Sequence, residues 1–190
     1  MRLFGFHDDH ACGYYRIVLP FAELARHGHV IDTNCGWTDR SKGYDVIVGQ
    51  RVGRIDALRL WRRLATPGRR LVWETDDDVW SIDPSNASAW LTHTPDVMDG
   101  IEFAARASHL VTVTNEYLAD VMARFNDNVA ILPNHFDAAL LGIERPQRER
   151  VTVGWKPTCT HTLREIEPCT VLDPFPAPAP PRSSRSSTGG

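Results

Sequence analysis

The chain has 190 residues, a formal net charge of −3, 42% hydrophobic residues and 24% charged residues, a composition typical of a soluble globular protein. No apolar run approaches the roughly 20 residues that span a bilayer, and no basic stripe is present, so we expect no integral membrane segment and no nucleic-acid partner. The amino terminus lacks a signal-peptide pattern and the cysteines are widely scattered. We therefore expect a cytoplasmic protein with reduced thiols and no structural zinc site.

Strand-like runs alternate with helical patterns along most of the chain. Short apolar runs bounded by turn residues predict strands, and apolar residues at three-to-four spacing predict helices. The expected strands cover residues 2–6, 29–33, 45–49, 69–74, 109–113 and 128–132. The expected helices cover the segment from Gly13 to a Gly28 stop, 55–64, 95–107 and 114–125, with a helical turn at 87–91. This alternation predicts an α/β fold, a Rossmann-like parallel sheet with helices on both faces.

The pattern divides the chain into three parts. Residues 1–141 are expected to form the Rossmann-like domain. Residues 142–167 begin as a charged linker and contain a strand-like run at 151–155, which is typical of the start of a second domain. Residues 168–190 are rich in Pro, Ser, Arg and Gly and cannot bury enough apolar surface to fold, so this tail is predicted to be disordered.

A polar loop containing a glycine connects the first strand to the first helix. Gly13 would let the backbone approach a ligand, the helix amino terminus offers N–H groups to an anion, and Arg16 offers a charge-assisted contact. We therefore take Gly13, Tyr14 and Arg16 as candidate substrate-binding residues. The alternative is structural, because a single loop glycine without a Gly-x-Gly-x-x-Gly pattern needs no function.

Three consecutive carboxylates, Asp76, Asp77 and Asp78, follow the fourth expected strand. Ligands of open α/β sheets lie just beyond the carboxyl ends of the strands, so we take these acids as candidate catalytic residues. Their chemistry remains open among a general base, acceptors for sugar hydroxyls and ligands for a hard divalent cation. An acidic turn that merely starts a helix is the structural alternative.

Two asparagines follow the next two strands at the same edge of the sheet. Asn115 and Asn134 are therefore weaker candidates for substrate binding. Both segments are also typical of a helix cap or a turn, and Thr114 is the expected N-cap of the helix that follows it.

These motifs, in this order, resemble bacterial and phage glycosyltransferases of the GT-B architecture, group-1 type. The resemblance rests on the glycine loop at 12–16, the acidic segment at 74–80, the Val-Thr-Val-Thr-Asn-Glu run at 111–116 and the Pro-Asn-x-x-Asp run at 133–137. Residues 151–155 resemble the first strand of the family's second domain.

The resemblance implies transfer of a sugar from a nucleotide-sugar donor to an acceptor of unknown identity, between two Rossmann-like domains. It implies that the amino-terminal domain holds the acceptor, that the Asp triplet lines the acceptor side, and that Gly13 approaches the donor. It implies no cofactor and no metal. Residues 156–159 lack the expected Gly-Ser, and no donor domain follows. We therefore expect a truncated or frameshifted chain with little activity alone, unless a separate chain supplies the donor domain.

Two alternatives belong to other functional classes. One is a Rossmann-like binding domain without catalysis. The other is a receiver-like signalling module, because Asp8 and Asp9 follow the first strand as in an acid pocket for Mg²⁺ and phosphorylation. The receiver alternative is disfavoured because that chemistry also requires a lysine after one of the last strands, and neither Lys42 nor Lys156 is so placed.

Overall fold

The computed structural model describes residues 1–9, 11–37 and 42–144. These residues belong to one compact unit. The expected linker beyond residue 144, the strand-like run at 151–155 and the expected disordered tail at 168–190 lie outside the described residues.

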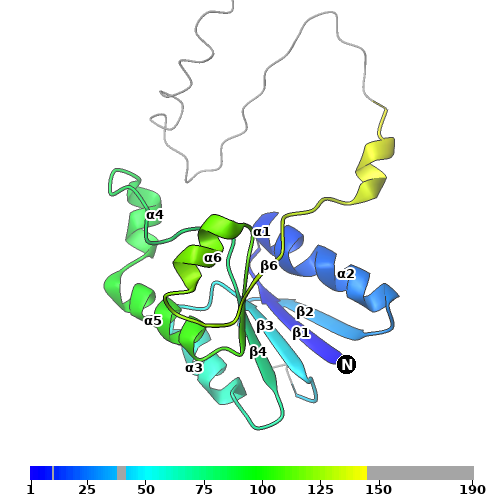
Figure 1. Ribbon diagram of the computed structural model, residues 1–190, viewed down its shortest axis with the longest axis horizontal. Helices are drawn as coiled ribbons and strands as arrows, with labels where there is room; N and C mark the ends of the chain where they lie inside the picture. The colour runs from blue at the N-terminus through cyan, green and yellow to red at the C-terminus, as the bar shows by residue number, and fades with distance from the viewer. Residues whose placement is uncertain (10, 38–41, 145–190) are drawn as a thin grey trace, which may run out of the picture. The chain divides into compact units, whose positions relative to one another are not determined.

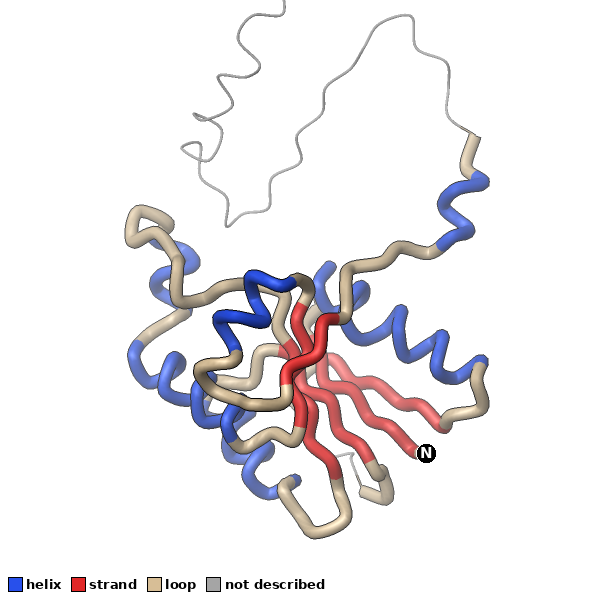
Figure 2. The backbone as a smooth tube through the Cα atoms, viewed as in Figure 1, coloured by secondary structure: helices blue, strands red, loops and turns tan. Residues whose placement is uncertain are grey.

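The described residues form one parallel sheet of six strands in the order β2-β1-β3-β4-β5-β6 (Figures 1 and 2). The strands are β1 (Arg2–His7), β2 (Val30–Cys35), β3 (Val46–Gln50), β4 (Arg70–Glu74), β5 (Leu110–Val113) and β6 (Val129–Ile131). Each neighbouring pair is parallel. The sheet confirms the predicted α/β, Rossmann-like fold.

Helices cover both faces of this sheet, as the sequence predicts (Figure 1). One face carries α1 (Ala11–Gly13), the π-helical turn η1 (Tyr14–Val18) and α2 (Leu19–Arg26). The other face carries α3 (Ile55–Leu64), α5 (Pro95–Arg106) and α6 (Glu116–Met122). The short α4 (Ala87–Thr92) precedes α5, and the 3-10 turn η2 (Ala138–Gly142) follows β6.

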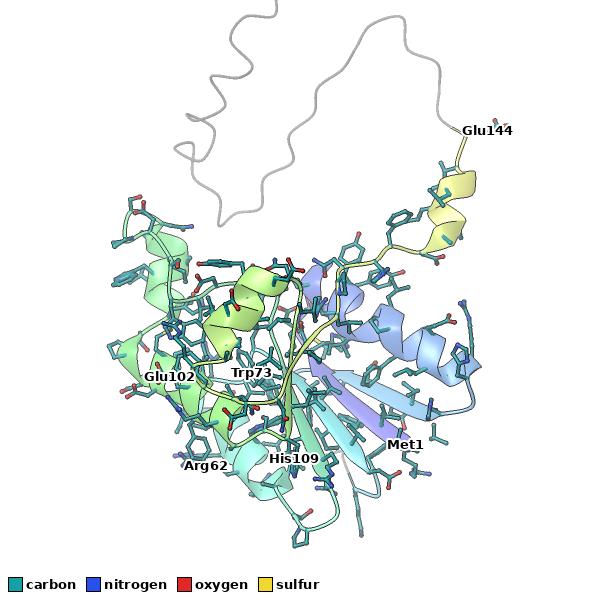
Figure 3. All side chains as sticks on the ribbon, viewed as in Figure 1. Met1, Arg62, Trp73, Glu102, His109 and Glu144 are labelled. Carbon is teal, nitrogen blue, oxygen red and sulfur yellow. The ribbon has the colours of Figure 1, made fainter. Side chains whose placement is uncertain are left out.

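Side chains alternate between two cores because successive residues of a strand point to opposite faces. The larger core includes Phe6, Trp61 and Trp73, each 1% exposed or less, and Figure 3 shows Trp73 in the interior. The smaller core packs η1 and α2 against β1 and β3. There, a Cβ added to Gly5 would lie 2.5 Å from Ile17 Cγ2, so this glycine lets the first helix approach the sheet.

The π-helical turn η1 is a feature that the sequence analysis did not predict. Within it, the N–H of Leu19 donates to the carbonyl of Tyr14. Pro20 has no N–H, and its ring would crowd the carbonyl of Arg16 in a regular α-helix, so a wider turn fits immediately before the proline. The wider turn lies at the carboxyl edge of the sheet and carries the buried side chains of Arg16 and Ile17.

The helix boundaries follow local signals with one correction. Gly28 has a φ of +82°, the left-handed conformation expected of a glycine that ends a helix. The prediction that Thr114 caps α6 is wrong. The helix begins at Glu116, and the side-chain oxygen of Asn115 accepts the N–H of Leu118 at 2.9 Å, because Asn115 is the residue placed one position before the helix.

Among the described residues, no helix combines the length and the apolarity needed to cross a bilayer.

Candidate functional site

The candidate site lies where the strand order changes direction. From β1 the chain leads to β2 on one side, and β3 then pairs with β1 on the other side. Ligands of open α/β sheets bind at such a switch point, beyond the carboxyl ends of the strands. The residues that follow β1, β3 and β4 at this edge are Asp8, Arg51 and the Asp triplet.

The side chain of Arg51 gathers acids from two loops. Its Nη2 lies 2.6 Å from Asp76 Oδ1 and 2.8 Å from Asp77 Oδ2, and its Nε donates to Asp76 Oδ1 at 3.0 Å. Its Nη1 lies 3.9 Å from Asp8 Oδ2. We call Asp8, Arg51, Asp76 and Asp77 the acid–arginine cluster. The guanidinium offsets the repulsion that adjacent carboxylates would otherwise feel.

Arg51 is a candidate residue that the sequence analysis missed. Its φ of 50° lies in the left-handed region, which is uncommon for residues other than glycine, and strained residues of this kind cluster at functional sites. Its N–H donates to the carbonyl of Glu74 at 2.9 Å, which ties this conformation to the end of β4. The signal in the sequence that could have identified Arg51 is its position, since it is a charged residue directly after the buried strand β3.

The charges of the cluster shift the pKa values of Arg51 and Asp77. Burial opposes the charge of Arg51, but Asp76 and Asp77 outweigh it and raise the pKa of Arg51, which therefore stays charged. Partial burial raises the pKa of Asp77, while the charges of Arg51 and of His93 oppose that rise. Asp77 also keeps a side chain that is 61% exposed, so it is the acid of the cluster best placed to meet a ligand.

Asp78 turns away from the cluster although it adjoins it in sequence. Its Oδ2 accepts hydrogen bonds from Ser81 Oγ and Tyr117 Oη, both at 2.6 Å, and its Oδ1 accepts the N–H of Trp80 at 3.0 Å. Burial alone would raise the pKa of Asp78, but these hydrogen bonds lower it. The structure thus brings Asp76 and Asp77 together and leaves Asp78 to stabilise the loop after β4.

The glycine of the first loop packs against that loop. A Cβ on Gly13 would lie 2.4 Å from the carbonyl oxygen of Asp8, so only glycine fits there without a shift of the backbone. The N–H of Gly13 donates to Asp8 Oδ1 at 3.1 Å. Gly13 therefore holds Asp8 within reach of Arg51, whereas the neighbouring Tyr14 is 44% exposed and accessible to a ligand.

Arg16 reaches into the protein. Its side chain is buried, with Nε 2.5 Å from Glu74 Oε1, and its Nη1 donates to the carbonyl of Leu132 and, at 3.2 Å, to Asn134 Oδ1. The structure thus brings together the predicted residues Arg16 and Asn134, but as residues that position η1, β4 and the segment after β6. The other asparagine candidate, Asn115, uses its side-chain oxygen to cap α6.

Three buried polar atoms near this pair have no hydrogen-bond partner among the described residues. They are Arg16 Nη2, Gln50 Nε2 and Glu74 Oε2. Gln50 adjoins the cluster because its Oε1 accepts the N–H of Asp8 at 3.2 Å. Burial raises the pKa of Glu74 to about 7, although Arg16 opposes the rise. Buried polar groups without a partner are rare in folded proteins, so these three atoms call for an explanation such as a bound ligand or water.

Cys12 is the thiol nearest the cluster. Burial and a hydrogen bond to Asp76 raise the pKa of Cys12 to about 12. The thiol therefore stays protonated at neutral pH and is a poor nucleophile.

Within residues 1–9, 11–37 and 42–144, no group of three or more His, Cys, Asp or Glu side chains is arranged to hold a metal ion. The positive charge between Asp76 and Asp77 is the guanidinium of Arg51. No protein-family model matches the sequence, and the search of curated proteins gave no match. The functional assignment therefore depends on the geometry of this edge together with the motif resemblance.

Proposed function

We propose that the described domain binds the sugar acceptor of a nucleotide-sugar-dependent glycosyltransferase. The observation that carries the proposal is the acid–arginine cluster at the switch point, where Arg51 fixes the carboxylates of Asp76, which is 11% exposed, and of Asp77, which is 61% exposed. Sugar hydroxyls both donate and accept hydrogen bonds. A fixed carboxylate beside a guanidinium offers both partners, and charge-assisted hydrogen bonds of this kind are the stronger ones.

The charge of the cluster favours an acceptor over a donor. Asp8, Asp76 and Asp77 supply three carboxylates against the one guanidinium of Arg51. A net negative site repels the diphosphate of a nucleotide-sugar and tolerates a neutral, polyhydroxylated molecule. The donor would then be held elsewhere, by another domain or by a separate chain.

Asp77 suits the role of general base in this proposal. Its raised pKa makes its carboxylate a better proton acceptor than an ordinary aspartate. An acceptor hydroxyl would lose its proton to Asp77 while its oxygen bonds to the anomeric carbon of the donor, and the nucleoside diphosphate would leave. Asp76, which Arg51 holds with two hydrogen bonds, would orient the acceptor.

The receiver-like alternative is less well supported. A phosphorylation pocket needs its acids free to hold a divalent cation. Here the guanidinium of Arg51 lies among those acids, and β3 ends at Gln50 and is followed by Arg51, with no carboxylate at this position.

The test is a titration of the full chain with a panel of methyl glycosides and of nucleotide-sugars, each with and without Mg²⁺, followed by calorimetry and ligand-observed NMR. We expect methyl glycosides to bind weakly without Mg²⁺. Asp77→Asn should weaken their binding about tenfold or more, since a hydrogen bond to a charged group is lost. Asp120→Asn, which removes an exposed acid of α6, is the matched control and should change nothing.

Two results would contradict the proposal in different ways. If no glycoside or nucleotide-sugar binds a chain that melts cooperatively, the sugar-binding role is rejected. If nucleotide-sugars bind tightly with Mg²⁺ and Asp77→Asn abolishes that binding, the acids hold the donor, and the acceptor role is rejected.

A further inference from the structure

A groove of about 680 Å³ is lined by residues of α3, α4 and α5, which lie on one side of the sheet (Figure 1). Large apolar side chains of its lining are exposed to water, Ile55 by 62%, Leu91 by 74% and Phe103 by 40%. Exposed charged residues line the same groove, namely Arg54, Arg62, Asp96 and Asp99. Exposed apolar side chains gathered with charged ones in one hollow are typical of a surface that binds another protein.

The floor of the groove is rigid because two backbones touch there. A Cβ on Gly100 would lie 2.1 Å from the carbonyl oxygen of Gly53, and a Cβ on Gly53 would lie 2.4 Å from Ile101 Cγ1. The loop after β3 is therefore locked against α5. Both glycines line the groove, so its surface is formed before a partner arrives, and little ordering opposes binding.

The charges of the groove are divided between its two long helices. Arg54 directly precedes α3, whereas Asp96 and Asp99 lie in α5. In the part of the chain that the structure describes, Arg54 forms no ion pair with either aspartate. The guanidinium of Arg62 lies 4.2 Å from the centre of the Phe103 ring, and Figure 3 shows Arg62 on the outer surface of the helices. Arg54, Asp96 and Asp99 therefore keep their charges open to a partner.

The sum of these charges narrows the class of partner. Two arginines and two aspartates line the groove, so its formal charge is zero. A surface of zero net charge attracts neither a nucleic acid nor a small anion or cation. A partner that fits must bring apolar side chains together with charges of both signs.

A second copy of the chain meets these requirements. A two-fold rotation about an axis along the groove lays α5 of the partner over α3, and α3 of the partner over α5. Because Gly53 touches Gly100, Arg54 and Asp99 lie at the same level on the two sides of the groove. The same rotation therefore brings Arg54 of each copy opposite Asp99 of the other. The charge pattern is complementary to itself, as a symmetric interface requires.

We infer that this groove is the interface of a homodimer in which α3 and α5 of one copy pack against α5 and α3 of the other. Ile55, Leu91 and Phe103 of both copies then leave water, and this burial supplies the affinity. The two contacts between Arg54 and Asp99 fix the orientation of the copies, since charges at the edge of an interface contribute more to specificity than to affinity.

The first test is sedimentation equilibrium of the full chain between about 1 and about 200 μM, the range in which a dimer of micromolar affinity dissociates. We expect a reversible equilibrium of monomer and dimer. Ile55→Asn/Leu91→Asn should raise the dissociation constant of the dimer about tenfold or more, because each lost apolar contact occurs twice. The matched control, Leu141→Asn/Ile143→Asn, changes residues of similar exposure, 71% and 60%, outside the groove and should leave the constant unchanged.

The second test reverses the charges that face each other. Arg54→Asp places like charges opposite each other at both contacts, and so does Asp99→Arg, so each variant alone should dimerise about tenfold more weakly. An equimolar mixture of the two variants restores opposite charges at both contacts and should dimerise as the parent chain does. Arg59→Asp, which reverses an exposed charge of α3 outside the groove, is the matched control and should not weaken the dimer.

Two kinds of result would overturn the inference. A parent chain that stays monomeric up to about 200 μM has no such interface. A dimer that Ile55→Asn/Leu91→Asn leaves intact, or charge variants that associate no more tightly when mixed than alone, would place the interface elsewhere on the chain. Circular dichroism of each variant shows that it is folded, and the charge variants keep the test decisive if the apolar one is not.

Discussion

Two arginine–carboxylate pairs lie at the same edge of the sheet, and they differ mainly in their exposure to water. The side chains of Arg16 and Glu74 are each 1% exposed. The side chain of Arg51 is 30% exposed, and those of its partners Asp76 and Asp77 are 11% and 61% exposed. The comparison teaches that the same chemical pairing holds the fold in one place and remains accessible to a ligand in the other.

The physical reason lies in desolvation. A buried ion pair loses the hydration of both charges, and removing one partner leaves the other charge uncompensated in a medium of low dielectric constant. The pair of Arg51 and Asp77 keeps part of its hydration, so these two groups can exchange hydrogen bonds with a ligand at a lower cost. Arg16 therefore positions three segments, whereas Arg51 is suited to contact a substrate.

The largest expected effect follows from removing the buried cation. Arg16→Met should lower the free energy of unfolding by about 3–5 kcal/mol, because Glu74 is left buried without its partner. Urea unfolding at neutral pH measures this change. The matched control is Arg26→Met, which breaks the exposed pair with Glu23, whose side chains are 75% and 55% exposed, and should leave stability unchanged within error.

A change of less than about 1 kcal/mol in the free energy of unfolding for Arg16→Met would contradict the role assigned to Arg16, because removing one partner of a buried ion pair costs more than that. Arg16 would then not be needed for the fold, and the contrast between Arg16 and Arg51 would be lost.

Much of the fold was predictable because it depends on local pattern. The helix α3 has the predicted bounds, and each strand lies within two residues of its prediction, since strands buried between two helical layers are recognisable as apolar runs. The π-helical turn was not predicted, because it depends on how Pro20 is accommodated against the sheet. The N-cap at Asn115 was missed by one residue for a different reason, because either of the two adjacent polar residues, Thr114 and Asn115, fits the pattern.

The candidate site was predictable only in part. The position of the acids after β4 follows from strand order, so the edge of the sheet was correctly expected to gather polar residues. The directions of Asp77 and Asp78 were not predictable, because one meets Arg51 and the other meets Tyr117, and both partners lie far away in the sequence. Arg16 was expected to face a ligand, and its pairing with Glu74 appears only once β4 and η1 are in place.

The second prediction concerns pH and the buried pair. Burial raises the pKa of Glu74 from its ordinary 4.5 to about 7, so between these values the folded chain keeps a proton that the unfolded chain has lost. The stability from this proton is complete below about pH 4.5 and is lost as the pH rises through about 7. The slope should reach up to about 1.4 kcal/mol per pH unit.

Urea unfolding across this pH range, for the parent chain and for Glu74→Gln, measures that effect. The difference between the two free energies of unfolding should shift in favour of Glu74→Gln as the pH rises, because glutamine does not titrate. A difference that stays constant between pH 4.5 and pH 7 would mean that Glu74 is charged throughout, with Arg16 outweighing its burial.

The smallest effect on stability is expected at the exposed arginine. Arg51→Met should lower the free energy of unfolding by less than Arg16→Met does, because the side chains of Arg51 and Asp77 are 30% and 61% exposed and solvent screens part of their interaction, although Asp76 is only 11% exposed. It should raise the pKa of Asp77 further, because the main charge that opposes the effect of burial is removed. A carboxyl-carbon NMR titration of Asp77 measures this, and Arg51→Lys, which keeps the charge, should show a smaller rise.

The result for Arg51 decides what the two pairs have in common. If Arg51→Met destabilises the chain as strongly as Arg16→Met, then both arginines hold the fold, and the accessible carboxylate of Asp77 is a by-product of packing. If stability is kept while the pKa of Asp77 rises, Arg51 sets the pKa of Asp77 without being needed for folding. Fixed charges that the fold does not require are what a binding site needs, because a ligand can then exchange hydrogen bonds with them without loosening the sheet.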